Sequence, residues 1–126
     1  MLHVILVVAM LWLAWFFFVL WQMQRPRGGV IYNRMVAAFL PAGEVISFWR
    51  VIYVKEPSQI ALMLAEGPAR AHELFHIDQQ WARWPLSFEF RYLWQAWRRG
   101  YGCNPFEEAA RAAAGQPSEC PVKGAL

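Results

Sequence analysis

The hydrophobic pattern divides the chain into one uninterrupted apolar segment and a longer stretch in which apolar and polar residues are mixed. Between Leu2 and Met23 the only polar or ionisable side chains are His3 and Gln22. A helix of about 20 residues crosses the roughly 30 Å of hydrocarbon in a bilayer, so this segment predicts a membrane-spanning helix. Residues 1–24 are therefore interpreted as a transmembrane anchor.

Two alternatives for the apolar segment fit its pattern less well. A buried core helix of a globular domain normally carries a polar face, and this segment has none. A cleaved signal peptide has basic residues before the apolar run and an Ala-x-Ala site after it. Here no Lys or Arg precedes the run, and Gln24-Arg25-Pro26-Arg27 follows it. We therefore expect the anchor to be retained.

The rest of the chain has the patterns of one small mixed domain. Two adjacent glycines make residues 25–29 a predicted flexible linker. The run EVISFWRVIYVK at residues 44–55 is rich in β-branched and aromatic residues and predicts one or two short strands. Prolines, glycines and capping residues delimit the predicted helices, which cover residues 30–40, 58–64, 68–83, 87–99 and 104–115. The predicted fold is α+β and mainly helical, with a domain at residues 30–115 and a flexible tail at 116–126.

Length and charge limit the functional classes. With 126 residues, the chain has room for one small domain besides the anchor. Its net charge is only +3 and its arginines are scattered, so it lacks the basic patch of a nucleic-acid-binding protein. Basic residues beside an anchor more often contact anionic headgroups, and membrane lipid is the expected partner of the N-terminal helix.

Charges and cysteines give different indications about the side of the membrane on which the domain lies. Arg25, Arg27 and Arg34 follow the apolar segment, whereas only the amino group and one histidine flank its other end. The positive-inside rule therefore predicts a single-pass protein with its domain in the cytoplasm. Cys103 and Cys120 either form a disulfide in an oxidising compartment or remain free thiols in the cytosol.

Two of the three histidines lie four residues apart in the sequence His72-Glu73-Leu74-Phe75-His76. On a helix, positions i and i+4 share a face, so both imidazoles can bind one metal ion. Glu73 lies beside them, within reach of a metal-bound water. In His-Glu-x-x-His hydrolases, zinc lowers the pKa of its water to about 7 and the glutamate accepts the proton. The motif therefore predicts Zn²⁺ bound by His72 and His76, with Glu73 as general base.

A catalytic zinc site needs a third protein ligand, and no histidine follows His76. The downstream candidates are Asp78, Glu89, Glu107, Glu108 and Glu119. Glu107 and Glu108 belong to a separate predicted helix and can approach the open side of the site. Glu107 also fits an N-capping box, in which its side chain bonds to the backbone N–H of Asn104. Metal binding and helix capping are both open interpretations of Glu107.

Three segments together resemble small bacterial metallopeptidase-like proteins of the minimal gluzincin type: HELFHIDQQW at 72–81, FEFRYLWQAW at 88–97 and GYGCNPFEEAA at 100–110. The family pattern is His-Glu-x-x-His-x-x-Gln, an aromatic linking helix and an Asn-Pro-Phe-Glu segment. The resemblance covers residues 50–112 and leaves out the anchor and the tail.

The resemblance implies a minimal zincin-like fold with these roles: His72 and His76 as zinc ligands, Glu73 as general base and Glu107 as third ligand. The family often continues Glu-x-Glu-Ala, whereas Ala109 stands at the second acidic position in this chain. If the family's ligand is that second glutamate, Glu108 is the nearest substitute.

The predicted function is a membrane-anchored zinc metallopeptidase that hydrolyses bonds in a peptide or protein substrate. The strand near residues 51–54 can present its edge to an extended peptide. Gln79 is a candidate for orienting a zinc ligand, and the candidates for stabilising an oxyanion are Tyr92, Tyr101 and Arg83. Two alternatives are a zinc ion that only joins helices and a metal-free, membrane-anchored interaction protein. Glu73 favours catalysis, because a structural zinc site has no use for a base.

Overall fold

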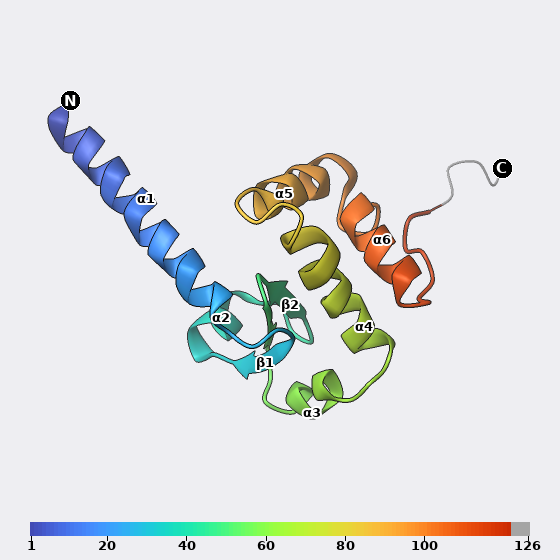
Figure 1. Cartoon of the computed structure of the whole chain (residues 1–126). Helices are drawn as coiled ribbons and strands as arrows, with labels where there is room; N and C mark the ends of the chain where they lie inside the picture. Colours follow the sequence, from blue (N-terminus) through green and yellow to red (C-terminus); the bar gives the residue numbers. More distant parts are fainter. Residues whose placement is uncertain (122–126) are drawn as a thin grey trace.

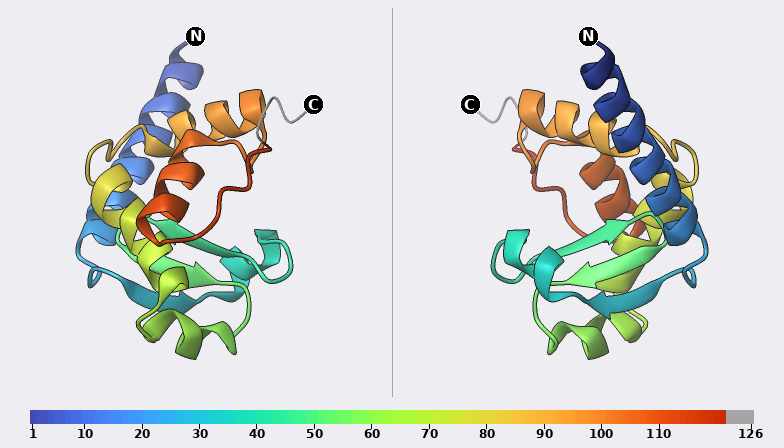
Figure 2. Two further views of the ribbon diagram at one scale, coloured as in Figure 1. Left: turned by 90° about the vertical axis from the view of Figure 1, so that its right-hand side faces the viewer. Right: turned by 90° about the vertical axis from the view of Figure 1, so that its left-hand side faces the viewer.

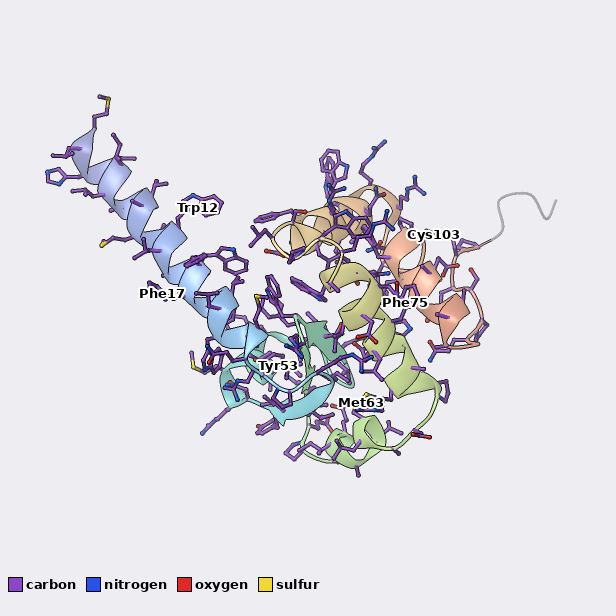
Figure 3. All side chains as sticks on the ribbon, viewed as in Figure 1. Trp12, Phe17, Tyr53, Met63, Phe75 and Cys103 are labelled. Carbon is purple, nitrogen blue, oxygen red and sulfur yellow. A yellow bond between two sulfur atoms is a disulfide. The ribbon has the colours of Figure 1, made fainter. Side chains whose placement is uncertain are left out.

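A computed structural model describes residues 1–121 and shows a mixed α+β protein from which one helix projects (Figure 1). This helix, α1, runs from Leu2 to Met23, as the apolar pattern predicts. Most of its surface is exposed, and the labelled side chains of Trp12 and Phe17 extend from that exposed surface (Figure 3). By length and composition, α1 is able to cross a membrane.

The C-terminal turns of α1 pack against the domain. Val19 and Gln22 are buried, and the Gln22 Nε2 atom donates to the Tyr53 hydroxyl at 3.0 Å. The predicted linker is also held in place, because the Gly28 N–H donates to the Arg50 carbonyl at 2.7 Å. These contacts join the end of α1 and the predicted linker to the domain.

Three short strands form one sheet in the order β1-β3-β2: Gly29–Tyr32 (β1), Val45–Phe48 (β2) and Val51–Val54 (β3). β3 pairs in parallel with β1 and antiparallel with β2. The prediction of strands within residues 44–55 is confirmed. However, β3 is the central strand and is buried along its length, so the expectation that its edge binds a peptide is wrong. β2 provides an outer edge instead.

The predicted helix at residues 30–40 is only half correct. Its first part forms β1, because the β-branched residues there pair with β3, which lies later in the sequence. Asn33 then begins helix α2 (Arg34–Phe39), and its side chain accepts hydrogen bonds from the Met35 and Val36 N–H groups. A parallel pairing partner gives no local sequence signal, which is why β1 was missed.

The remaining helices lie close to their predicted bounds: α3 (Gln59–Leu64), α4 (Pro68–Phe75), α5 (Phe88–Arg99) and α6 (Pro105–Ala113). After α4 the chain continues as a π-helix, η1 (His76–Trp81), where the sequence predicts continuation of the α-helix. Figures 1 and 2 show α5 toward the end of the molecule from which α1 projects and α3 at the opposite end. One apolar cluster joins α1, η1 and α5, and its buried members are Val19, Trp49, Trp81 and Phe88.

The described part of the predicted flexible tail makes specific contacts. A disulfide joins Cys103 to Cys120, so the oxidised alternative for the two cysteines is present. The Glu119 carboxylate pairs with the Arg111 guanidinium of α6 at 2.9 Å. These long-range contacts, which the Pro, Gly and Ser content did not indicate, hold the segment after α6 in place. Residues 122–126 of the predicted tail lie outside the described residues.

Candidate metal centre

The three residues that the sequence assigns to zinc lie together. His72 and His76 are one helical turn apart, at the end of α4 and the start of η1, and Glu107 lies in the first turn of α6. The two Nε2 atoms are 3.1 Å apart. The Glu107 carboxylate oxygens lie 3.1 Å from His72 Nε2 and 3.4 Å from His76 Nε2. One ligand atom from each residue lies within 4.8 Å of the others, so this group can hold a metal ion.

Two glutamine side chains hold the outer nitrogens of the histidines. His76 Nδ1 lies 2.6 Å from Gln80 Oε1, and His72 Nδ1 lies 2.9 Å from Gln116 Oε1. An amide oxygen only accepts hydrogen bonds, so each Nδ1 carries a proton and each Nε2 faces the cluster. A ring held in this way binds a metal through Nε2 once that nitrogen has lost its proton. The donor set therefore fits a cation.

Gln80 also joins the two helical elements around the cluster. Its Nε2 atom donates to the Phe106 carbonyl of α6 at 2.8 Å. Gln80 is buried, whereas Gln79, the residue predicted to orient a ligand, is exposed. Gln80 lies four residues after His76, so the i, i+4 spacing of a helix could have indicated its contact with His76. Gln116 lies beyond the last helix and has no comparable signal.

Glu107 is the acidic candidate that faces the histidines. Its carboxylate also accepts a hydrogen bond from the Tyr92 hydroxyl at 2.7 Å. The capping-box interpretation is wrong, because the Asn104 N–H donates to the Tyr101 carbonyl and not to Glu107. Asn104 itself caps α6 by accepting from the Phe106 N–H at 3.1 Å. Glu107 therefore faces the histidines and not the helix cap.

The other acidic candidates have different contacts. Glu108 pairs with Arg111 at 2.8 Å, and Asp78 pairs with Arg27. Glu119 also pairs with Arg111, at 2.9 Å. These ion pairs account for three of the four alternatives to Glu107. The fourth, Glu89, has no hydrogen-bond partner for its carboxylate among residues 1–121.

The histidines and Glu107 share protons through hydrogen bonds when no metal is bound. Burial alone would raise the pKa of Glu107, but hydrogen bonds from His72 and His76 outweigh it and hold this pKa well below its usual range. Burial alone would lower the pKa of His76, but the hydrogen bond and charge of Glu107 outweigh it and raise this pKa. A metal ion bound here must therefore displace a proton.

Glu73 lies beside the cluster and is buried. It lines the same cavity as His76 and Glu107 but is not one of the three converging ligands. Burial raises the pKa of Glu73, and the charges of His76 and His72 only partly oppose this. A carboxylate with a raised pKa is suited to accepting a proton near neutral pH.

Two cavities meet at Glu73. The larger has a volume of about 480 Å³ and mainly apolar walls, which include Val45, Phe48, Trp81, Phe88 and Leu93. The smaller has a volume of about 220 Å³ and polar walls, which include His72, Arg111, Gln116 and Glu119. Val45 of the edge strand β2 lines both cavities. The cluster thus lies between an apolar and a polar cavity beside β2.

The structure brings two of the three predicted oxyanion-stabilising residues to the cluster. Tyr92 and Tyr101 line the larger cavity, and burial raises the pKa of both hydroxyl groups, so both stay protonated at neutral pH. Arg83 is exposed, and its guanidinium lies 5.1 Å from the ring centre of Trp84. Arg83 is therefore placed on the surface and away from the cavity lining.

Comparison of the chain with protein-family models, curated proteins and solved structures finds no match. The resemblance to minimal gluzincins therefore stays a prediction that rests on the sequence motifs. The same holds for the zincin-like character of the domain.

Proposed function

We propose that the chain is a membrane-anchored zinc metallopeptidase. The observation that carries this proposal is the convergence of His72, His76 and Glu107 beside a cavity that Glu73 also lines. Two histidines and one carboxylate are a known catalytic zinc set, in which the fourth position is left for water or substrate. Structural zinc sites use four protein ligands, and among residues 1–121 this group has three. The donor count therefore supports catalysis over a purely structural metal.

The chain's own residues have distinct roles in the proposed hydrolysis. His72, His76 and Glu107 would hold the zinc, which lowers the pKa of its water to about 7 and polarises a carbonyl group. Glu73 accepts the proton of the attacking water and transfers it to the departing amine. Tyr92 holds the Glu107 carboxylate in position through their 2.7 Å hydrogen bond. These roles assign Glu73 as the only catalytic base.

Tyr101 is the residue that we assign to the substrate carbonyl oxygen. Its side chain lines both cavities. Its hydroxyl group is protonated at neutral pH and able to donate a hydrogen bond. Tyr92 is less suited to this role, because its hydroxyl already donates to Glu107.

The substrate that fits this site is an extended peptide or protein segment. β2 is an edge strand, and its four residues, Val45–Phe48, line the larger cavity. A peptide can add to such an edge through backbone hydrogen bonds, with alternate side chains entering the cavity. The apolar walls favour a large apolar side chain beside the scissile bond.

Zinc content and activity of the full-length chain test the proposal. We expect about one zinc ion per chain in the wild type, loss of zinc in His76→Ala and Glu107→Ala, and retention in Glu108→Ala. Glu108 is the matched control, because it neighbours Glu107 and pairs with Arg111. Metal analysis of protein purified in detergent provides the measurement. A wild type without stoichiometric zinc would remove both the peptidase and the structural-zinc hypotheses.

The catalytic role is tested separately with Glu73→Gln. This variant should keep its zinc and lose about 10²- to 10⁴-fold in peptide hydrolysis, the range of general base catalysis. Cleavage of an unstructured protein and of fluorogenic peptides with large apolar residues gives the rates. Zinc binding with no hydrolysis in the wild type would favour a structural or interaction role. Hydrolysis that survives Glu73→Gln would exclude Glu73 as the base.

A further inference from the structure

The outer side of α5 carries an apolar stripe. Phe90, Leu93, Trp94 and Trp97 are between 53% and 78% exposed. Their spacing of three, one and three residues places all four on one face of the helix. The opposite face packs inward, where Phe88 is buried in the core cluster. Four large apolar side chains in one exposed stripe mark an interaction surface.

Arginines border this stripe. The guanidinium of Arg98 lies 5.7 Å from the ring centre of Trp94, which in turn lies 5.3 Å from the ring of Trp97. Figure 3 shows ring-bearing and nitrogen-tipped side chains extending from α5 on the side away from the sheet. Tryptophan is enriched at the membrane–water boundary, and arginine binds lipid phosphates there. The composition of the stripe therefore fits the surface of an anionic bilayer.

The length of α1 brings α5 to this boundary. Trp15 and Val19 of α1 pack in the same apolar cluster as Phe88, the first residue of α5. The segment from Leu2 to Ala14 before this cluster is exposed throughout, and it extends only about 20 Å at ~1.5 Å per residue. A bilayer has roughly 30 Å of hydrocarbon. If α1 crosses a bilayer, lipid must therefore reach the level at which α5 begins.

We propose that α5 lies along the membrane–water interface and inserts Phe90, Trp94 and Trp97 into an anionic bilayer, with Leu93, which also lines the larger cavity, at the edge of the stripe. Both views in Figure 2 show α5 toward the end from which α1 projects, as this arrangement requires. The domain is then held by two membrane contacts, α1 across the bilayer and α5 on its surface. The proposal depends on the positions of α1 and α5 and is independent of zinc binding and of peptidase activity.

Photocrosslinking of the full-length chain tests the contact. The chain is reconstituted in vesicles of phosphatidylethanolamine and phosphatidylglycerol with the photoreactive residue p-benzoylphenylalanine at one position. Phe90→p-benzoylphenylalanine probes the stripe, and Leu62→p-benzoylphenylalanine is the matched control on α3. Leu62 is 59% exposed and Phe90 is 66% exposed, but α3 lies at the opposite end of the molecule from α1. Phe17→p-benzoylphenylalanine in α1 reports correct insertion.

We expect lipid adducts, measured by mass spectrometry, at positions 90 and 17, with at least a several-fold lower yield at position 62. Lipid adducts at position 17 combined with a yield at position 90 no higher than that at position 62 would overturn the proposal. Crosslinks from position 90 to a second copy of the chain, in place of lipid, would also overturn it and assign the stripe to self-association. Exposed positions tolerate the photoreactive ring, so a folding failure does not confound the comparison.

Discussion

Gln80 positions His76 through a single pair of hydrogen bonds. Its Oε1 atom accepts from His76 Nδ1, and its Nε2 atom donates to the Phe106 carbonyl. Gln80→Leu keeps the size of the side chain but removes both bonds, so the ring of His76 loses its fixed tautomer and orientation. We expect zinc affinity to fall by about 10- to 100-fold, the usual effect of removing a residue that orients a metal ligand. Competition with a calibrated zinc chelator measures this change.

The control for this prediction is Gln79→Leu. Gln79 precedes Gln80 in the same π-helix but is exposed. Its replacement tests whether a leucine in η1 weakens zinc binding through the helix itself. Equal losses of affinity in the two variants would show that Gln80 acts through general packing and not through His76.

Glu89 is a half-buried acid whose carboxylate has no hydrogen-bond partner among residues 1–121. Both of its carboxylate oxygens are buried and lack a hydrogen-bond partner within residues 1–121. Burial raises the pKa of Glu89. The folded state then binds more protons than the unfolded state, so stability falls as the pH rises from the unfolded pKa through the folded one. We expect Glu89→Gln to raise the thermal midpoint at neutral pH by a few degrees and to leave it unchanged below about pH 4.

Thermal unfolding in detergent at both pH values tests whether the charge of Glu89 destabilises the folded protein. Glu66→Gln is a suitable control, because Glu66 is exposed in the loop before α4 and its replacement should change little at either pH. A Glu89→Gln variant that is less stable than the wild type at neutral pH would show that the carboxylate has a stabilising partner after all.

Residues that act within one helix were predictable, and residues brought from elsewhere were not. His72 and His76 follow from i, i+4 spacing, whereas the second helix offered both Glu107 and Glu108, and only the resemblance to minimal gluzincins favoured Glu107. Gln116 contacts His72 only because the chain after α6 folds back, and no local pattern encodes that return. The sequence therefore supplied the three converging ligands but only part of the hydrogen-bonding shell that orients them.

At the scale of elements, the predictions failed where a tertiary contact overrides a local preference. The helical pattern of residues 68–83 predicts a continuous α-helix, whereas the chain changes to a π-helix at His76. Such π-segments are uncommon and occur often at functional sites. Here the change coincides with the point at which Gln80 bridges His76 and α6. Likewise, β1 depends on its pairing with β3 and cannot be recognised from four residues alone.

The disulfide between Cys103 and Cys120 connects the start of α6 to the returning tail. It closes a segment with a sequence separation of 17 residues. A crosslink over such a loop contributes about 3 kcal/mol by limiting the unfolded chain. We expect the double variant Cys103→Ser, Cys120→Ser to have a clearly lower thermal midpoint than the wild type. Weaker zinc binding should accompany this, because the tail no longer holds Gln116 against His72.

Gln116→Ala separates these two effects. It removes the 2.9 Å contact with His72 but leaves the disulfide intact. We therefore expect weaker zinc binding in Gln116→Ala with little change in thermal midpoint. If the double cysteine variant matched the wild type in both measurements, the tail would have no role in the stability or the metal affinity of the chain.

At the scale of the whole molecule, the anchor and the domain form one unit. Gln22 of α1 bonds to Tyr53 of the central strand, and the Arg50 side chain donates to the Met23 carbonyl at 2.8 Å. Val19 belongs to the same apolar cluster as Trp81 of η1. The cluster of His72, His76 and Glu107 therefore lies in the same packed unit as the end of α1. The sequence predicted both parts but not this connection, because an all-apolar helix does not reveal which face is buried.

The arginines after α1 and the disulfide give opposite indications about the side of the membrane on which the domain lies. Arg25, Arg27 and Arg34 favour the cytoplasm, as the sequence analysis predicts. The disulfide favours an oxidising compartment, since cytosolic thiols are kept reduced. We expect the domain to lie on the oxidising side, because the Cys103–Cys120 bond persists there. This bond lies close in sequence to Gln116, which contacts His72. Full-length protein fused at its C-terminus to alkaline phosphatase should be active in bacteria, whereas a green fluorescent protein fusion should be dark.

Alkylation in intact cells provides an independent readout of the same prediction. On the oxidising side, Cys103 and Cys120 are joined and should react with a membrane-permeant maleimide only after reduction. On the cytoplasmic side, both thiols would react without a reductant, and the fusion reporters would give the reverse result. That outcome would establish the orientation predicted by the arginines. It would also mean that contacts such as the Arg111–Glu119 pair, and not a covalent bond, hold Gln116 at His72 in the cell.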